Sequence, residues 1–193
     1  IRTPLNVILG FADLALEKSE LSADTKGYLS SIRRNAEQLA EFLGEILDLS
    51  KIEASRLEIE EIRFPLVPMI SEVLSFLDLH AREKNLSLSL ERLGPLPKQV
   101  KTDPTRLRQI LTNLISNAIK FTERGFVKVG VRMISAQKPG TPLQLEFTVT
   151  DSGIGICDDR RERLFTPYAQ AELSTTRQFG GTGLGLHLSK QLA

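Results

Sequence analysis

The amino-acid sequence predicts an α+β fold in which an N-terminal helical hairpin, residues 1–57, precedes a domain of mixed helices and strands, residues 58–193. Three observations carry this prediction. Apolar residues recur at steps of three and four up to about Ala54, which is the period of an amphipathic helix. After Leu57, short segments alternate apolar and polar residues, which is typical of strands. Between these segments the helical period returns over residues 69–83 and 103–122.

The hairpin consists of two helices joined by a polar turn at residues 19–24, where Ser22 is a suitable N-cap. The first helix has its apolar side chains at Leu5, Ile8, Leu9, Ala12, Ala15 and Leu16. The second has a heptad seam formed by Leu29, Ile32, Ala36, Leu39, Leu43 and Ile46. Because Phe42 and Leu47 widen this stripe beyond what two helices can bury, we expect a dimeric four-helix bundle. The alternative is a hairpin that packs on its own downstream domain.

The second domain is expected to contain several short strands. They are predicted at residues 57–64, 86–90, 99–102, 126–134 and 143–151, the last two as an antiparallel pair. Pro65 and Pro68 separate the first strand from the helix at residues 69–83. The loop at residues 135–142 contains two prolines and a glycine, so we expect it to be exposed.

Bulk composition excludes several classes of protein. With 41% hydrophobic and 25% charged residues and a net charge of +1, the chain reads as a globular protein that does not bind nucleic acid by bulk electrostatics. No apolar run reaches the ~20 residues of a membrane span, so we expect no membrane contact. The single cysteine, Cys157, excludes an internal disulfide and fits a reducing, cytoplasmic compartment. The chain starts and stops within helical patterns, so we expect a piece of a longer protein, with further strands after Ala193.

The helix at residues 103–122 has two faces of different chemistry. Asp103 is a suitable cap and Pro104 suits the first turn. One face is an apolar stripe made of Leu107, Ile110, Leu111, Leu114, Ile115, Ala118 and Ile119. The other is a polar stripe made of Gln109, Asn113, Asn117 and Lys120. This polar stripe is either a solvated face or part of a binding site.

Two glycine-containing segments follow this helix. The first is D-x-G-x-G at residues 151–155, where a carboxylate at a strand end precedes glycines that let a flat ligand approach the backbone. The second is F-G-G-T-G-L-G-L at residues 179–186, just before a final helix. Glycines there expose N–H groups that suit phosphate oxygens. It lacks the Lys-Ser/Thr pair of a Walker A loop, and no strand immediately precedes it as in a Rossmann fingerprint.

Taken together, these segments resemble the ATP-binding domain of histidine kinases, which has the GHKL (Bergerat) α/β sandwich fold shared with gyrase, mismatch-repair and heat-shock chaperone ATPases. Residues 164–170 look like the F box of that family, with Tyr168 where Phe is usual. Residues 1–6, I-R-T-P-L-N, look like the end of the H box. The resemblance therefore covers almost the whole chain and implies the catalytic core of a sensor histidine kinase, hybrid types included.

The resemblance implies a role for each matching residue. ATP and Mg²⁺ are the implied cofactors, with Asn117 as the metal ligand and with Asn113 and Lys120 on the phosphate side. Asp151 would bind the adenine amino group, Phe121 would wall the base, and the pocket floor would contain Gly153 and Gly155. The phosphates would be bordered by Gly181, Thr182, Gly183, Leu184 and Gly185. Arg177 would neutralise the terminal phosphate; its neighbour is Gln178, where many relatives have a second basic residue.

One position separates transfer from hydrolysis. In the hydrolysing members of this fold a Glu lies one turn before the metal-binding Asn and activates water. Here that residue is Asn113, which cannot accept a proton. The resemblance therefore implies phosphoryl transfer to a side chain.

The implied acceptor is a His two places before Ile1, outside this chain. His80 and His187 are expected to be structural. Thr3 matches the position that orients water when such kinases dephosphorylate their partner, or it is a plain helix residue. The implied partners are a second copy, through residues 1–57, and the receiver domain of a response regulator. Two alternatives stay open: a degenerate kinase-like module that regulates another kinase by binding, and, disfavoured by Asn113, a GHKL ATPase.

Overall fold

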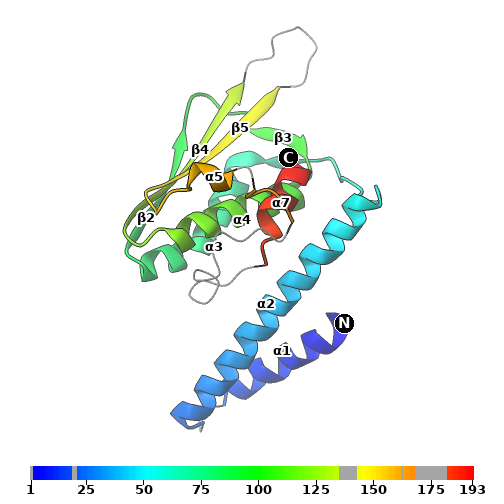
Figure 1. Cartoon of the computed structure of the whole chain (residues 1–193), viewed down its shortest axis with the longest axis vertical. Helices are drawn as coiled ribbons and strands as arrows, with labels where there is room; N and C mark the ends of the chain where they lie inside the picture. The colour runs from blue at the N-terminus through cyan, green and yellow to red at the C-terminus, as the bar shows by residue number, and fades with distance from the viewer. Residues whose placement is uncertain (1, 19–20, 135–142, 162, 168–181) are drawn as a thin grey trace. The chain divides into compact units, whose positions relative to one another are not determined.

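The computed structural model describes residues 2–18, 21–134, 143–161, 163–167 and 182–193. The chain divides into two compact units, Ile1–Leu57 and Glu58–Ala193. The described part of the first unit is helical, and the second combines helices with strands, which confirms the α+β prediction (Figure 1). None of the described helices combines the length and the apolar character needed to cross a lipid bilayer.

The first unit is a hairpin of α1 (Arg2–Leu16) and α2 (Ala23–Glu53) (Figure 1). Ser22 caps α2 as predicted, because its side-chain oxygen accepts a hydrogen bond of 3.2 Å from the backbone N–H of Thr25. The helices bury Leu5, Ala12 and Ala36. Many other apolar side chains remain exposed, namely Val7, Ile8, Phe11, Leu14, Tyr28, Ile32, Leu39 and Leu47.

The described part of the second unit contains two sheets and four helices. Its strands are β1 (Ile62–Pro65), β2 (Leu86–Arg92), β3 (Gln99–Thr102), β4 (Gly125–Ile134) and β5 (Gln144–Asp151). Its described helices are α3 (Leu66–Glu83), α4 (Pro104–Phe121), α5 (Asp158–Arg161) and α7 (Gly185–Leu192). β1 pairs with β3 in a two-stranded antiparallel sheet, and the order of the other sheet is β2-β4-β5. β2 is parallel to β4, and β4 forms the predicted antiparallel pair with β5.

The core of this unit lies between the helices and β4. Val127, Val129 and Val131 alternate along β4 and are fully buried, so one face of the strand is apolar. The apolar faces of α3 and α4 cover it with Leu66, Ile70, Val73, Leu77, Leu111, Ile115 and Ile119. Because its apolar stripe is used in the core, α4 turns its polar stripe the other way, and Asn113 and Asn117 are only half-buried.

Two element boundaries differ from the prediction by three residues or more. The first strand begins at Ile62 and not at Leu57. Its partner β3 is short and pairs only with residues Ile62 to Pro65. α3 begins at Leu66, ahead of the predicted residue 69, and includes Pro68 in its first turn. Proline is tolerated there because the first-turn N–H groups have no acceptor within the helix.

Asp103 fixes the start of α4. Its Oδ1 accepts hydrogen bonds from the backbone N–H groups of Thr105 (2.9 Å) and Arg106 (3.1 Å), while Oδ2 accepts one from Glu60 (3.2 Å). Burial of the carboxyl acts to raise its pKa, but the three N–H donors and the charge of Arg106 outweigh burial, so the pKa is lowered. Asp103 therefore caps the helix and also joins it to the segment that precedes β1.

We expect Asp103→Asn to lower the free energy of unfolding by about 1 kcal/mol at neutral pH. The cap then loses a negative charge that interacts favourably with the positive end of the helix dipole. A lowered folded-state pKa stabilises the protein above the unfolded-state pKa of about 3.9, and this contribution is lost as pH falls through the folded-state value. The difference between the two proteins should therefore shrink below about pH 4. Urea unfolding across pH measures it, with exposed Glu58→Gln as control. A difference that does not depend on pH would contradict this account of the cap.

Candidate functional site

The polar stripe of α4 is bonded to the last helix, α7. Asn117 lies one turn after Asn113 and donates from Nδ2 to Asn113 Oδ1 at 3.1 Å. Asn113 in turn donates from Nδ2 to Ser189 Oγ on α7 at 2.7 Å. Ser189 is buried, so this chain of hydrogen bonds joins the two helices at a point shielded from water. The bond to Asn113 uses the Nδ2 of Asn117 and not its amide oxygen.

The start of α7 lies directly against Asn113. A β-carbon at Gly185 would overlap Oδ1 of Asn113 and lie 2.9 Å from its Cγ, so glycine is required for this approach. The residues before the helix form a tight turn in which Thr182 Oγ1 accepts the N–H of Leu184 at 3.1 Å. Leu184 is buried and anchors this turn, and Gly183 has left-handed backbone with φ +72°. The described part of the predicted glycine loop therefore lies beside the polar stripe.

The loop that carries Asp151 packs on the other end of α4. Ile154 donates its backbone N–H to the carbonyl of Phe121 at 3.3 Å, and Gly153 donates to Asp151 Oδ1 at 2.9 Å. A β-carbon at Gly153 would lie 2.5 Å from the Phe121 carbonyl oxygen, so the loop can dock only with glycine there. Gly155 has left-handed backbone with φ +71°, and Asp151 is exposed at the end of β5.

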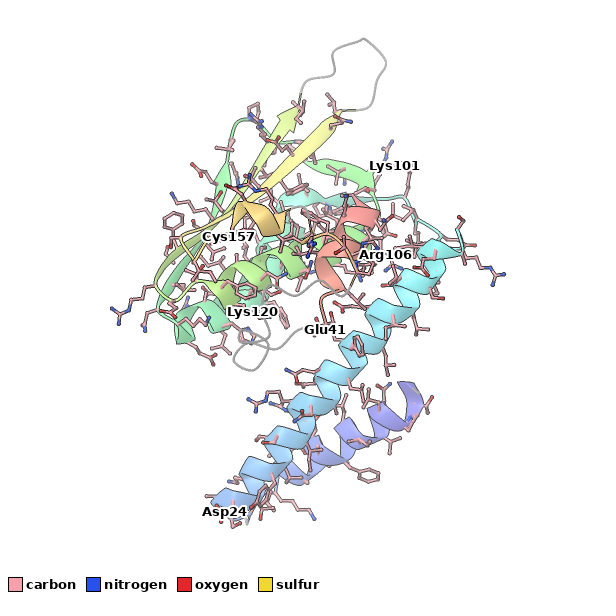
Figure 2. The ribbon with its side chains drawn as sticks, viewed as in Figure 1. Asp24, Glu41, Lys101, Arg106, Lys120 and Cys157 are labelled. Atoms are coloured by element: carbon pink, nitrogen blue, oxygen red, sulfur yellow. The ribbon has the colours of Figure 1, made fainter. Side chains whose placement is uncertain are left out.

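Lys120 and Phe121 belong to the last turn of α4, where the loop after β5 docks. Lys120 and Arg106 mark opposite ends of this helix (Figure 2). The ammonium of Lys120 lies 4.9 Å from the centre of the Phe121 ring, and burial lowers the pKa of Lys120. A cation that has lost part of its hydration is stabilised by an anionic neighbour. This position therefore suits a phosphate.

Lys84, at the end of α3, also contacts this end of α4, and nothing in the sequence predicted this contact. Its Nζ donates to the backbone carbonyls of Ile119 at 2.9 Å, Lys120 at 2.8 Å and Thr122 at 3.4 Å. No local pattern marks such a residue, because its acceptors lie more than thirty positions away in the chain.

The other predicted residues lie as follows. Thr3 is on α1 in the first unit and is exposed. Arg177, Gly181 and Tyr168 lie outside the described residues. His187 is on α7, where its Nδ1 is hydrogen-bonded to the carbonyl of Phe165 at 2.8 Å. Cys157 is exposed, just after the loop that carries Asp151 (Figure 2).

The donor set fits a nucleotide-bound magnesium ion. Within the described ranges, no group of three or more His, Cys, Asp or Glu side chains is placed to hold a metal. Mg²⁺ in nucleotide sites takes few protein ligands and completes its octahedron with phosphate oxygens and water. The amide oxygen of Asn117, whose Nδ2 is bonded to Asn113, is a ligand of the required kind.

Two family models match separate parts of the chain. Residues 1–55 match the His Kinase A (phospho-acceptor) domain, and residues 102–193 match the family described as histidine kinase-, DNA gyrase B-, and HSP90-like ATPase. The signal transduction histidine-protein kinase BarA of Escherichia coli (strain K12) is 41% identical over 192 residues. The sensor protein GacS of Pseudomonas syringae pv. syringae is 44% identical over 192 residues. Each match covers 100% of this chain but only 21% of the relative.

A solved structure of similar fold covers nearly the whole chain. It is full-length ShkA in complex with AMPPNP, with a TM-score of 0.76 and 32% sequence identity over 99% of this chain and 38% of that one. Both domain families of a histidine kinase are thus matched in order along one chain. In the second, the polar stripe of α4 is hydrogen-bonded to α7. The chain belongs to the histidine kinase family.

Proposed function

We propose that this chain is the catalytic core of a two-component sensor histidine kinase. It binds ATP with Mg²⁺, transfers the terminal phosphoryl group to a His just upstream of Ile1, and passes it to an aspartate of a response-regulator receiver domain. The observation that carries the proposal is the hydrogen-bonded set of Asn117, Asn113 and Ser189, against which Gly185 brings the start of α7. This set brings an oxygen ligand for a cation close to a turn whose backbone N–H groups suit phosphates.

In this proposal the middle and the C-terminal end of α4 serve different parts of the nucleotide. At the middle, Asn117 holds the metal and Asn113 lies on the phosphate side, and Lys120 in the last turn also contacts the phosphates. The bound Mg²⁺ offsets the charge of the phosphate oxygens during transfer. Further phosphate contacts come from Gly181, Thr182, Gly183, Leu184 and Gly185, with Arg177 at the terminal phosphate. At the C-terminal end, Asp151 accepts the adenine amino group beside Phe121, over Gly153 and Gly155.

Asn113 favours transfer over hydrolysis. An amide is not a base at neutral pH, so this side chain cannot activate water. Both of its polar atoms are also engaged, Nδ2 with Ser189 and Oδ1 with Asn117. Transfer of the terminal phosphoryl group to a side chain is therefore favoured over its hydrolysis by water. This supports a kinase over a GHKL ATPase. Relatives named as kinases give no support to the alternative of a degenerate regulatory module.

The first unit forms the dimer, and the proposed acceptor lies just upstream of it. Its exposed apolar side chains lie on both helices, and a second hairpin would cover them in a four-helix bundle. Thr3, one turn after the proposed acceptor, is exposed on α1 and is available to orient water in the reverse, dephosphorylating reaction.

We expect Asn117→Ala in the full-length protein to lower autophosphorylation at least about a hundredfold, because it removes the proposed metal ligand. Labelling with γ-³²P-ATP measures this, and retained Mg²⁺-dependent activity would rule out the role. Gln109→Ala is the matched control on the same helix, since Gln109 pairs with Arg106 instead.

Asp151→Asn should weaken binding of an ATP analogue about tenfold, because a charge-assisted hydrogen bond to the base is replaced by a neutral one. Isothermal calorimetry measures the affinity. Glu146→Gln removes a carboxylate from the same strand, where it pairs with Arg132, and should leave binding unchanged. Equal affinities for all three proteins would remove Asp151 from the base site.

The bundle can be tested with adjacent substitutions on α2. Leu39→Asp replaces an apolar side chain, 47% exposed in the single hairpin, with a charged one. It should raise the dimer dissociation constant at least about tenfold, because a buried leucine contributes ~1.5–3 kcal/mol. Gln38→Asp should have little effect. Sedimentation equilibrium measures the dissociation constant of each variant. An unchanged constant for Leu39→Asp would contradict the proposed interface.

A further inference from the structure

We infer that Lys84 is a positioning residue for the nucleotide site: its ammonium group fixes the last turn of α4 and, through that turn, the loop that carries Asp151. The inference rests on the proposed function, because it concerns the same site. Lys84 touches no nucleotide in this proposal and acts only through the backbone of α4.

The backbone of Lys84 is itself held in place. Lys84 is the C-cap of α3, where its N–H bonds to the carbonyl of Ala81 at 3.2 Å. The next residue, Asn85, has left-handed backbone with φ 56° and turns the chain into β2. Asparagine is among the few residues that adopt this conformation readily, so the turn is compatible with the sequence. The side chain of Lys84 therefore starts from a fixed point and is half-buried.

The last carbonyls of α4 have no partners within the helix, as in any helix. Here each one from Ala118 to Thr122 is satisfied from another source. Ala118 accepts from Thr122 Oγ1 at 2.7 Å and Phe121 accepts from the Ile154 N–H at 3.3 Å. The carbonyls of Ile119, Lys120 and Thr122 all accept from Lys84 Nζ.

The chemistry of the ammonium group matches this task. Lysine has three N–H donors and no acceptor, and here they meet the three carbonyls. Its positive charge lies at the negative end of the helix dipole, which adds to the attraction. An apolar side chain at this position would leave partly buried carbonyls without donors.

The geometry of this turn decides where the site residues lie. Lys120 and Phe121 project from it, and the Phe121 carbonyl is the point where Ile154 and Gly153 dock. If the turn unwinds, the docking point moves and Asp151 loses its place relative to Phe121. The contacts of Asn113 with Asn117 and Ser189 lie further up the helix and do not depend on Lys84.

The test compares Lys84→Met with Lys101→Met in the full chain. Lys101 is an exposed lysine on β3 that pairs with Glu61, so its loss is the matched control (Figure 2). Two readouts are used: the affinity for AMPPNP with Mg²⁺ by calorimetry, and hydrogen–deuterium exchange of the Ile154 amide. For Lys84→Met we expect at least about fivefold weaker binding and faster exchange at Ile154, with β4 and β5 still protected. Lys84→Arg, which keeps the charge and the donors, should restore most of both.

Several outcomes would overturn the inference. One is a folded Lys84→Met protein with unchanged affinity and unchanged exchange at Ile154. Another is faster exchange throughout β4 and β5 together with the loop, which indicates a general structural role. If Lys84→Met does not fold, Lys84→Gln is measured in its place and judged by the same criteria. A wild-type chain that does not bind AMPPNP would instead refute the proposed function.

Discussion

Opposite charges hold α4 at its two ends, and the arrangement of the second unit depends on this. Asp103 accepts N–H groups at the positive end of the helix, and Lys84 donates to carbonyls at the negative end. Each also reaches a distant segment: Asp103 bonds to Glu60 before β1, and Lys84 belongs to the end of α3. The helix is thus fixed along its axis, while its apolar face is fixed by the core of α3 and β4.

With α4 held in this way, two separate loops can be built against it. The turn at residues 182–185 packs beside Asn113, and the loop after β5 docks at Phe121. Both contacts require glycine because the backbone comes closer than a β-carbon allows. These glycines therefore allow two loops to pack against the same helix, in addition to permitting the turns within them.

Local patterns were sufficient to predict most of the elements. The caps at Ser22 and Asp103, the pairing of the last two strands and the apolar stripe of α4 all follow from neighbours in the sequence. The start of α3 was placed too late because a proline was treated as a boundary, although a first turn accepts it.

The contacts that local patterns do not predict are those between distant residues. The bond from Asn113 to Ser189 and the contacts of Lys84 join segments separated by 76 and about 36 positions. The parallel pairing of β2 with β4 is of the same kind. Such contacts depend on how the elements pack, and neither periodicity nor propensity contains that information. For this reason, the polar stripe of α4 was recognised from the sequence and its partner on α7 was not.

The exposed thiol of Cys157 offers a practical route into this region. The sequence contains one cysteine, and it lies six positions after Asp151, beyond the loop that docks on α4. A maleimide dye will therefore attach at a single, known place without any engineered substitution. Its emission would report movements of this loop in solution, in the same preparation used for the exchange measurements, and in real time.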